Sequence, residues 1–328
     1  MRELLLSAEG LVKHYTVRRQ FLGSAPRQLR AVDGVSFELA RREVLGVVGE
    51  SGCGKSTVGR MVMRLIEPTE GRVVFDGVDV TALDRTALRT LRRRIQIVFQ
   101  DPYSSLNPRL TIGRIVGEPL RIHRLCDEHA IEARTAEMLR KVGLGPDHMP
   151  RYPHELSGGQ RQRVGIARAL ISNPEMVVAD EPVSALDVSI QAQVLNLIAD
   201  LRREMQLSML MISHNMAVIQ HACDRIAVMY LGQIVELGAA DEIVVAPAHP
   251  YTEALVSAVP VPDPSAQRRR IVLKGDVPSP IDPPSGCRFH TRCPHATPQC
   301  AAEVPLLQEV RPGHWAACHR SRQIYGAA

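Results

Sequence analysis

The sequence predicts an α/β fold with a mixed, largely parallel sheet, a helical subdomain and a small irregular lobe at its C-terminal end. Short apolar runs typical of buried strands alternate with segments of helical spacing, which favours a parallel sheet with crossover helices. A glycine-rich turn separates one such strand from a helix. Near residue 258 the composition changes, and "SAVPVPDPSAQRRR" and "DVPSPIDPPSG" are rich in proline.

The individual elements follow from periodicity. "VLGVVG" is a short continuous apolar run ending in glycine, as expected for a buried strand. Residues 189–205 place apolar side chains on one face of a long helix, and "RIAVMYLGQIVELG" predicts two strands joined at Leu-Gly. Strands are predicted at 4–15, 30–40, 44–49, 95–100, 175–182, 207–215 and twice within 225–238. Helices are predicted at 57–66, within 111–145 and at 189–205.

Composition excludes several classes of protein. The 328 residues are 45% hydrophobic and 23% charged, which is ordinary for a globular protein with a sizeable core. A formal net charge of +5 lacks the clustered excess of a nucleic-acid binder. No apolar stretch is long enough to span a bilayer, and the first residues lack a signal-peptide pattern. We therefore expect a cytoplasmic protein whose seven cysteines are kept reduced.

A phosphate-binding pattern follows the strand at 44–49. "GESGCGKST" fits G-x-x-x-x-G-K-[ST], in which glycines let backbone N–H groups face phosphate oxygens. Lys55 would reach the β- and γ-phosphates and Ser56 would hold Mg²⁺, while the following helix adds its dipole. The strand and helix on either side favour a P-loop over a plain glycine-rich turn. The predicted ATP-binding residues here are Gly49, Ser51, Gly52, Cys53, Gly54, Lys55, Ser56 and Thr57.

Two carboxylates end the strand in "MVVADE". Asp180 would serve Mg²⁺, directly or through water. Adjacent strand residues point to opposite sides, so Glu181 can have a separate role. It is the predicted general base for the attacking water. The apolar strand that leads into this pair argues against an ordinary surface acidic pair.

A second anion cradle lies more than a hundred residues after the first. "HELSGGQRQRVGIARAL" sets a serine and two glycines directly before a predicted helix. Its "LSGGQ" resembles the signature sequence of ABC-transporter ATPases. The chain resembles this family over about residues 4–255, because further family motifs occur in the family's order. These are the P-loop, Gln100 after "IVF", "ADEP" (179–182), "SALD" (184–187) and "ISHN" (212–215).

The resemblance implies why one chain carries two cradles. In this family two nucleotide-binding domains dimerise head to tail, and each ATP lies between the P-loop of one domain and the signature of the other. Ser157, Gly158 and Gly159, followed by Gln160, would then neutralise the γ-phosphate presented by the partner domain. Closure would depend on ATP, and hydrolysis would remove the bridging charge.

Further roles are implied at single positions. Tyr15 matches the aromatic residue that stacks on adenine, although a packed strand tyrosine is the alternative. Gln100 would contact Mg²⁺ or the attacking water. Asp187 would lie at the dimer interface. His214 would bond the γ-phosphate and position the water near Glu181. With these residues present, we expect this chain's own P-loop side to hydrolyse ATP.

Two stretches resemble the peptide and nickel importer branch of the family, "QDPYSSLNPR" (100–109) and "AHPYTEALVSAVP" (248–260). The resemblance implies an ATPase subunit of a bacterial dipeptide or oligopeptide importer, peripheral to the cytoplasmic face of the inner membrane. Its implied partners are a second, homologous ATPase subunit, two transmembrane permease subunits and an extracytoplasmic solute-binding protein. Nucleic acid is not among them. A helical subdomain, about 101–165, would receive a permease coupling helix.

Alternatives remain open within and outside this branch. The importer could carry nickel or another solute, and the ATPase pair could be a homodimer or a heterodimer. Export is disfavoured because exporters are commonly fused to their membrane domains. A soluble ABC ATPase acting on ribosomes or DNA would carry two ATPase domains or long coiled-coil insertions, neither of which is present. The expected domains are 1–258, the nucleotide-binding domain, and 259–328, a C-terminal extension.

Four cysteines in that extension suggest a soft metal centre. Their spacing is C-x5-C-x6-C-x17-C, longer than the usual zinc knuckle. The spacing, and the resemblance to peptide-importer ATPases with a [4Fe–4S] cluster, favour iron–sulfur. Zinc stays open because four histidines (His290, His295, His314 and His319) lie nearby, and unliganded or disulfide-bonded cysteines are a third possibility. The predicted ligands are Cys287, Cys293, Cys300 and Cys318.

Overall fold

The protein is described from a computed structural model covering residues 3–17, 27–259 and 271–326. Residue contacts divide the chain into two compact units. Unit 1 comprises the described residues within Met1–Glu3, Ala40–Glu43 and Ala82–Ile212, and unit 2 those within Leu4–Leu39, Val44–Thr81 and Ser213–Ala328. Residues 260–270, which make up most of the proline-rich "SAVPVPDPSAQRRR", lie outside the described residues.

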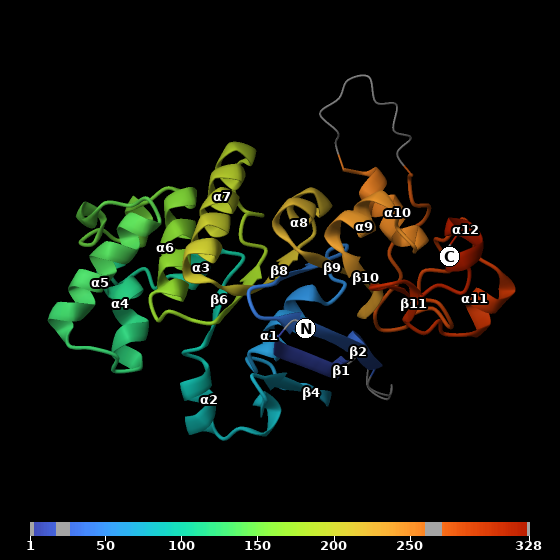
Figure 1. Cartoon of the computed structure of the whole chain (residues 1–328), viewed down its shortest axis with the longest axis horizontal. Helices are drawn as coiled ribbons and strands as arrows, with labels where there is room; N and C mark the ends of the chain where they lie inside the picture. Colours follow the sequence, from blue (N-terminus) through green and yellow to red (C-terminus); the bar gives the residue numbers. More distant parts are fainter. Residues whose placement is uncertain (1–2, 18–26, 260–270, 327–328) are drawn as a thin grey trace, which may run out of the picture. The chain divides into compact units, whose positions relative to one another are not determined.

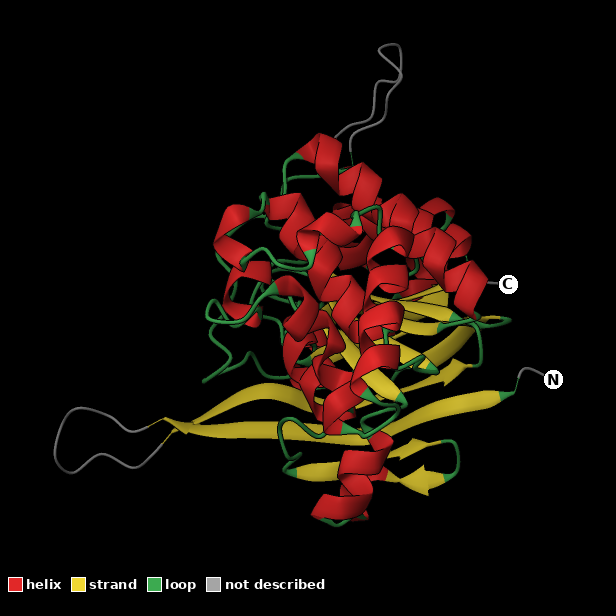
Figure 2. Ribbon diagram, turned by 90° about the vertical axis from the view of Figure 1, so that its left-hand side faces the viewer, coloured by secondary structure: helices red, strands yellow, loops and turns green. Residues whose placement is uncertain are grey.

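Unit 2 holds two groups of strands and several short helices (Figure 1). A four-stranded sheet has the order β2-β1-β4-β5, and β1 and β2 run side by side as long strands (Figure 2). The strands are β1 (Leu4–Val17), β2 (Arg27–Ala40), β3 (Val44–Val48), β4 (Glu70–Phe75), β5 (Val78–Asp79), β9 (Arg225–Tyr230), β10 (Gln233–Ala239), β11 (Gln308–Arg311) and β12 (His314–Ala316). The helices are α1 (Lys55–Val62), α8 (Met216–Ala222), α9 (Ala240–Val245), α10 (Pro250–Ser257), α11 (Pro298–Ala302) and α12 (Ser321–Tyr325).

The second group of strands in unit 2 is mixed in direction. Strand β3, whose five residues are all buried, pairs parallel with β9, with Val47 opposite Ala227. Strands β9 and β10 form an antiparallel hairpin whose turn places Leu231 and Gly232 at positive φ, as the Leu-Gly prediction required. A continuous apolar strand such as β3 is typical of the buried interior of a parallel pair.

The C-terminal extension is less irregular than its proline content predicts. Strand β12 pairs antiparallel with β10, with Trp315 opposite Leu237, so the extension adds to the same sheet. Strands β11 and β12 form a hairpin, and Gly313 supplies its positive φ of 74°. Buried Glu236 of β10 accepts a 2.7 Å hydrogen bond from His314 Nε2 of β12. This hydrogen bond attaches the extension to β10, at a place where hydrophobic periodicity predicted no strand.

Unit 1 contains three parallel strands and the longest helices. Strand β7 pairs with β6 and with β8, and its five residues are buried. The strands are β6 (Ile95–Val98), β7 (Met176–Asp180) and β8 (Ser208–Ser213), the last ending at the boundary with unit 2. The helices are α2 (Arg85–Leu91), α3 (Pro102–Ser105), α4 (Ile112–Ile122), α5 (Glu128–Lys141), α6 (Gly158–Leu170) and α7 (Val188–Met205). Short 3₁₀ turns occur at Val80–Ala82, Pro146–His148 and Pro153–Glu155.

Helices α4, α5 and α6 pack together as a small bundle (Figure 1). Each presents an apolar face that includes a fully buried residue, namely Val116, Leu139 and Val164. Asp127 caps α5 by accepting a 2.8 Å hydrogen bond from Ala130 N. Helices α4 and α5 lie inside the range about 101–165 in which a helical subdomain was predicted, and α6 begins in that range and ends beyond it.

No described helix is both long enough and apolar enough to cross a membrane.

Candidate functional site

Strand β3 leads into the P-loop. Two glycines of the P-loop are packed so closely against neighbouring backbone that no side chain would fit. A Cβ on Gly49 would lie 2.1 Å from the carbonyl oxygen of Met229, and one on Gly54 would lie 2.1 Å from that of Ala31. Gly52 and Gly54 also have positive φ, 82° and 105°. The loop therefore curls tightly onto neighbouring strands, and helix α1 begins at Lys55 directly after it. Such a turn into a helix N-terminus is a ready anion site.

Lys55 is only 4% exposed and is held by the loop itself. Its Nζ donates to the carbonyl oxygens of Gly49 and Glu50, at 2.8 and 2.9 Å. Ser56 and Thr57 follow in the first turn of α1. Burial is the largest cause that raises the pKa of the Cys53 thiol. The thiol therefore stays neutral, and the residue contributes its backbone groups to the loop rather than a charge. The P-loop thus holds the ammonium group of Lys55 through two of its own carbonyl oxygens, and phosphate oxygens are acceptors that can replace them.

In unit 1, the ends of two neighbouring strands bring Gln100 and Glu181 together. Strands β6 and β7 are parallel, and Val98 lies opposite Ala179, so the residues that follow emerge at one edge. Gln100 Nε2 donates a 2.9 Å hydrogen bond to Glu181 Oε2. Asp180 precedes Glu181 and is 1% exposed. An amide and two carboxylates at a strand end are suited to a metal ion and a water molecule.

The backbone of Glu181 adopts a conformation that sequence reasoning did not anticipate. Its φ is 48°, in the left-handed region that is uncommon for residues other than glycine. Glu181 N donates to the carbonyl oxygen of Ile212 at 2.9 Å, and Ser184 Oγ donates to the Glu181 carbonyl at 3.1 Å. These bonds hold the residue on both sides of its Cα. Strained backbone of this kind tends to cluster at functional sites.

The signature residues open helix α6 and form a capping box. Ser157 Oγ accepts from Gln160 N at 3.3 Å, and Gln160 Oε1 accepts from Ser157 N at 2.9 Å. Ser157 and Gly158 are exposed, and Gly159 and Gln160 are partly exposed. The box leaves an accessible helix N-terminus carrying a hydroxyl, as the second cradle requires. Sequence reasoning predicted an anion cradle here but did not predict the capping box.

Asp187 lies at the N-cap of helix α7 and is exposed. The first turn of α7 packs against the start of α6, because a Cβ on Gly159 would lie 2.7 Å from Ile190 Cγ2. A side chain at Gly159 would therefore push the two helix ends apart. The structure thus brings the "LSGGQ" and "SALD" segments together within unit 1.

Tyr15 and His214 belong to unit 2. Tyr15 lies in β1 with 38% of its surface exposed, and Lys13 Nζ is 5.2 Å from the centre of its ring. A ring this exposed is available for stacking. His214 follows β8 and is exposed, and Asn215 caps α8 by accepting from Ala217 N at 2.9 Å. The P-loop and the four-cysteine segment share this unit, whereas Gln100, Asp180, Glu181, the signature and Asp187 belong to unit 1.

The four predicted metal ligands of the C-terminal extension line one small cavity, shared with His290, His295 and His319. Burial is the largest cause that raises the pKa of Cys287, to about 11, and the other three thiols add to the rise. His314 is not part of this cavity. Among the described residues no three Cys, His, Asp or Glu side chains are close enough to share one metal ion. The thiols thus converge without forming a closed site.

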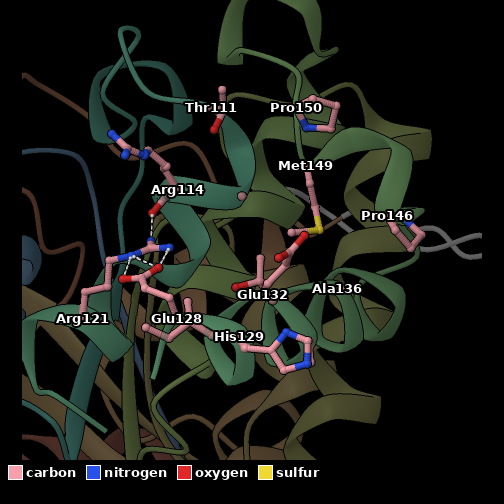
Figure 3. A pocket seen from close by; sticks show the side chains of 14 residues that line it. Thr111, Arg114, Arg121, Glu128, His129, Glu132, Ala136, Pro146, Met149 and Pro150 are labelled. Carbon is pink, nitrogen blue, oxygen red and sulfur yellow. Dashed lines mark hydrogen bonds and ion pairs between the residues drawn. The ribbon is translucent and has the colours of Figure 1, made fainter. Parts of the chain in front are cut away.

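A groove that sequence reasoning missed lies in the helical subdomain, between α4, α5 and the segment 146–150 (Figure 3). Arg121 and Glu128 face each other in it as a bidentate pair, with 2.9 Å between Nε and Oε1 and 2.8 Å between Nη2 and Oε2. Met149 supplies apolar lining and Glu132 a further carboxylate. The groove therefore combines charge with apolar surface.

Comparison with protein families matches two regions. Residues 32–184 match the model described as "ABC transporter". Residues 235–300 match "Oligopeptide/dipeptide transporter, C-terminal region". The second region includes most of β10, all of α9 and α10, and three of the four clustered cysteines.

Full-length relatives are similar over nearly the whole chain. A "Putative peptide import ATP-binding protein" of Brucella ovis is 54% identical over 316 residues, covering 96% of this chain and 98% of the relative. The "Oligopeptide transport ATP-binding protein AppF" of Bacillus subtilis is 51% identical over 321 residues, covering 97% and 98%.

Among solved structures, an ATP-binding cassette in a dimeric post-hydrolysis state bound to ADP and Pi matches with a TM-score of 0.65. It is 29% identical and covers 72% of this chain and 99% of that chain. The subunit CbiO1 of the CbiONQ transporter from Clostridium perfringens has a TM-score of 0.62 and 26% identity, covering 74% of this chain and 90% of that chain. The P-loop, the strand-end carboxylates, the signature helix and these similarities agree: the chain belongs to the ABC transporter family, as an ATPase of that family.

Proposed function

We propose that this chain is the ATP-hydrolysing subunit of a bacterial ABC importer for dipeptides or oligopeptides. The observation that carries the proposal is the presence of two loops of phosphate-binding type, at the starts of α1 and α6, in a chain whose C-terminal region matches that of peptide transporters. The relatives are named for peptide import and oligopeptide transport. Nickel or another solute is the alternative cargo within the same branch.

In this proposal the P-loop binds ATP, and the residues that follow strands β6, β7 and β8 take part in its hydrolysis. Lys55 donates to phosphate oxygens in place of the carbonyls it now contacts, and Ser56 and Asp180 offer oxygen ligands for Mg²⁺. Tyr15 stacks on the adenine. Each of these roles uses a chemical group that the residue has, and the exposed ring of Tyr15 is accessible for stacking.

Glu181 is the proposed general base. It takes a proton from the water that attacks the γ-phosphate, and Gln100 holds one carboxylate oxygen and contacts Mg²⁺ or the water. His214 bonds the γ-phosphate and positions the water.

The helix N-terminus at Ser157 serves a second ATPase subunit. Ser157, Gly158 and Gly159, supported by Gln160, bind the γ-phosphate held on the partner's P-loop, and Asp187 lies beside them at the interface. ATP then links two subunits, and its hydrolysis removes the γ-phosphate that bridges them. We propose a homologous, non-identical partner; a second copy of this chain is the alternative.

The remaining partners are two permease subunits and an extracytoplasmic solute-binding protein, with this chain held at the cytoplasmic face of the inner membrane. The groove of α4 and α5 is the proposed receptor for the permease's coupling helix (Figure 3). Its bidentate pair and apolar wall suit an amphipathic helix. We retain the division into an ATPase domain, 1–258, and an extension, 259–328.

We further propose that the extension holds a [4Fe–4S] cluster, with Zn²⁺ as the alternative. The support for either centre is the donor type, because four cysteines line one cavity; a single Zn²⁺ would need these thiols closer together than they lie among the described residues. Such a centre would tie together a lobe with a small core of its own. Anaerobically purified protein should be brown and contain iron and sulfide. A colourless protein containing one zinc would reject the cluster, and a metal-free, correctly folded protein would reject both.

The transport function is tested by isolating the intact complex from membranes and identifying its subunits. We expect two permease subunits, a second ATPase and peptide-stimulated hydrolysis in the presence of the solute-binding protein. Stimulation by nickel but not by peptides would establish the alternative cargo. Co-isolation with ribosomes or DNA, without permease subunits, would overturn the importer assignment.

A further inference from the structure

The segment between Cys287 and Cys293 contacts the P-loop. It carries Arg288, Phe289 and Arg292, and both arginine side chains are 7% exposed. The P-loop and this segment belong to the same compact unit. Neither arginine has a role in the chemistry proposed above. Their burial and contacts therefore call for another explanation.

Arg292 makes a bidentate ion pair with Glu50, the second residue of the P-loop. Its Nη1 lies 2.8 Å from Glu50 Oε2 and its Nη2 lies 3.2 Å from Oε1. Nη1 also reaches Tyr230 Oη at 3.4 Å, and the guanidinium lies 5.9 Å from the centre of that ring. A two-point bond of this kind fixes orientation as well as distance. Arg292 therefore restrains the direction of the Glu50 side chain.

Glu50 is restrained at its backbone as well. Its N–H donates to Tyr251 Oη at 2.8 Å, and its carbonyl oxygen accepts from Lys55 Nζ at 2.9 Å. The lysine expected to bind phosphate and the arginine of the cysteine segment thus hold one residue from two sides. A displacement of Glu50 would move a hydrogen-bond partner of Lys55.

The rest of the segment is anchored near the same loop. Phe289 packs against Tyr230 and Tyr251, with ring centres 5.2 and 5.4 Å apart. Arg288 hydrogen-bonds the carbonyl oxygen of Leu231 and the carboxylate of Asp33. Leu231 precedes Gly232, whose N–H donates to the P-loop carbonyl of Cys53 at 2.9 Å. The segment is therefore connected to the loop at more than one point.

We propose that Arg292 is a positioning residue for nucleotide binding. It links the P-loop, through Glu50, to the four-cysteine lobe, which is the described part of the C-terminal extension (271–326). The inference rests on the proposed ATP-binding function. Because it concerns a binding equilibrium, the link acts both ways: a lobe that holds Arg292 in place favours nucleotide, and bound nucleotide orders the lobe. Loosening the Cys287–Cys293 segment lowers nucleotide affinity by the same route.

Equilibrium binding of fluorescent ADP to the full-length chain tests the first direction. Arg292→Ala should weaken binding about tenfold, the cost of one charge-assisted bond, and raise KM for ATP while kcat stays close to that of the wild type. Arg292→Lys keeps the positive charge but loses the planar guanidinium that bonds at two points, so its affinity for ADP should lie between those of the wild type and Arg292→Ala. Combining Arg292→Ala with Glu50→Gln should add little to the single changes.

Arg311→Ala is the matched control. Arg311 belongs to the same lobe and donates to the carbonyl oxygens of Ala246 and Tyr325, neither of which is in the P-loop. Its loss should leave ADP affinity unchanged. Equal weakening by both arginine variants would overturn the inference, because the effect would then be a general loosening of the lobe. Wild-type affinity in Arg292→Ala would overturn it too.

Hydrogen exchange measured by mass spectrometry tests the reverse direction. ADP should slow exchange in the P-loop and in residues 287–293, and Arg292→Ala should retain the first protection and lose the second. Protection of the wild-type P-loop without any change in 287–293 would overturn the link alone. Absence of protection in the P-loop would overturn the proposed nucleotide binding as well, so the two failures are distinguishable.

Discussion

In Glu181→Gln, the side chain that follows β7 loses its negative charge but keeps its shape. The new amide oxygen can still accept from Gln100 Nε2, which now lies 2.9 Å from Glu181 Oε2. The backbone bonds that hold φ at 48° are also unaffected. We therefore expect stability to change by less than about 1 kcal/mol, and ATP to bind with its normal affinity.

Turnover should fall sharply because the general base is lost. General-base catalysis contributes about 10²- to 10⁴-fold, which corresponds to about 3 to 5 kcal/mol of activation free energy. Phosphate release under saturating ATP measures the rate, and fluorescent ATP measures binding. Because ATP then stays intact between two subunits, sedimentation should show a longer-lived dimer with the partner ATPase.

Glu175→Gln is the matched control, since Glu175 precedes the same strand at its opposite end. It should hydrolyse ATP at the wild-type rate. Turnover by Glu181→Gln within about threefold of the wild type, at unchanged ATP affinity, would refute the base assignment, because a loss of base catalysis is far larger. Loss of ATP binding itself would show that Glu181 holds nucleotide instead.

Three further predictions concern the P-loop and the fold. Lys55→Ala should weaken ATP binding by about tenfold or more, because a charge-assisted contact to phosphate is lost; titration with fluorescent ATP measures this, and undiminished affinity would contradict the assignment. Gly49→Ala should lower unfolding free energy by about 1–3 kcal/mol, because its Cβ would meet the Met229 carbonyl at 2.1 Å. Gly165→Ala, in open space within α6, should not lower it; thermal denaturation compares the two, and equal losses would refute the packing argument. Hydrogen bonding to Arg94 is the largest cause that lowers the pKa of Glu175. The lowered pKa therefore stabilises the folded protein at pH values above the pKa of the unfolded carboxyl, and this stability is lost as the pH falls through the pKa of the folded state. In Glu175→Gln the unfolding free energy, measured by urea titration at several pH values, should fall less steeply in acid than in the wild type. An unchanged dependence on pH would exclude a contribution from the Glu175–Arg94 pair.

The elements that periodicity predicted are those with a regular pattern of burial: β3 is buried at every residue, and α7 is buried along one face. Strand β3 and helix α7 appear within one or two residues of their predicted bounds. The hairpin β11–β12 was missed in a tail expected to be irregular. Its pairing with β10 depends on contacts more than seventy residues apart, such as Glu236 with His314. The residues close to β11 and β12 in the sequence therefore carry no information about the distant strand with which they pair.

The sequence by itself determined which motifs the chain carries: glycines, one lysine and two adjacent carboxylates at fixed spacings can be recognised because each motif is continuous along the chain. Only the tertiary structure decided which side chains meet. It joined Gln100 to Glu181, set Glu181 in a left-handed backbone conformation and brought Arg292 to Glu50 across 241 intervening positions. The physical reason is that such contacts are fixed by the packing of strands and lobes, whose energy is shared among many residues distant in sequence.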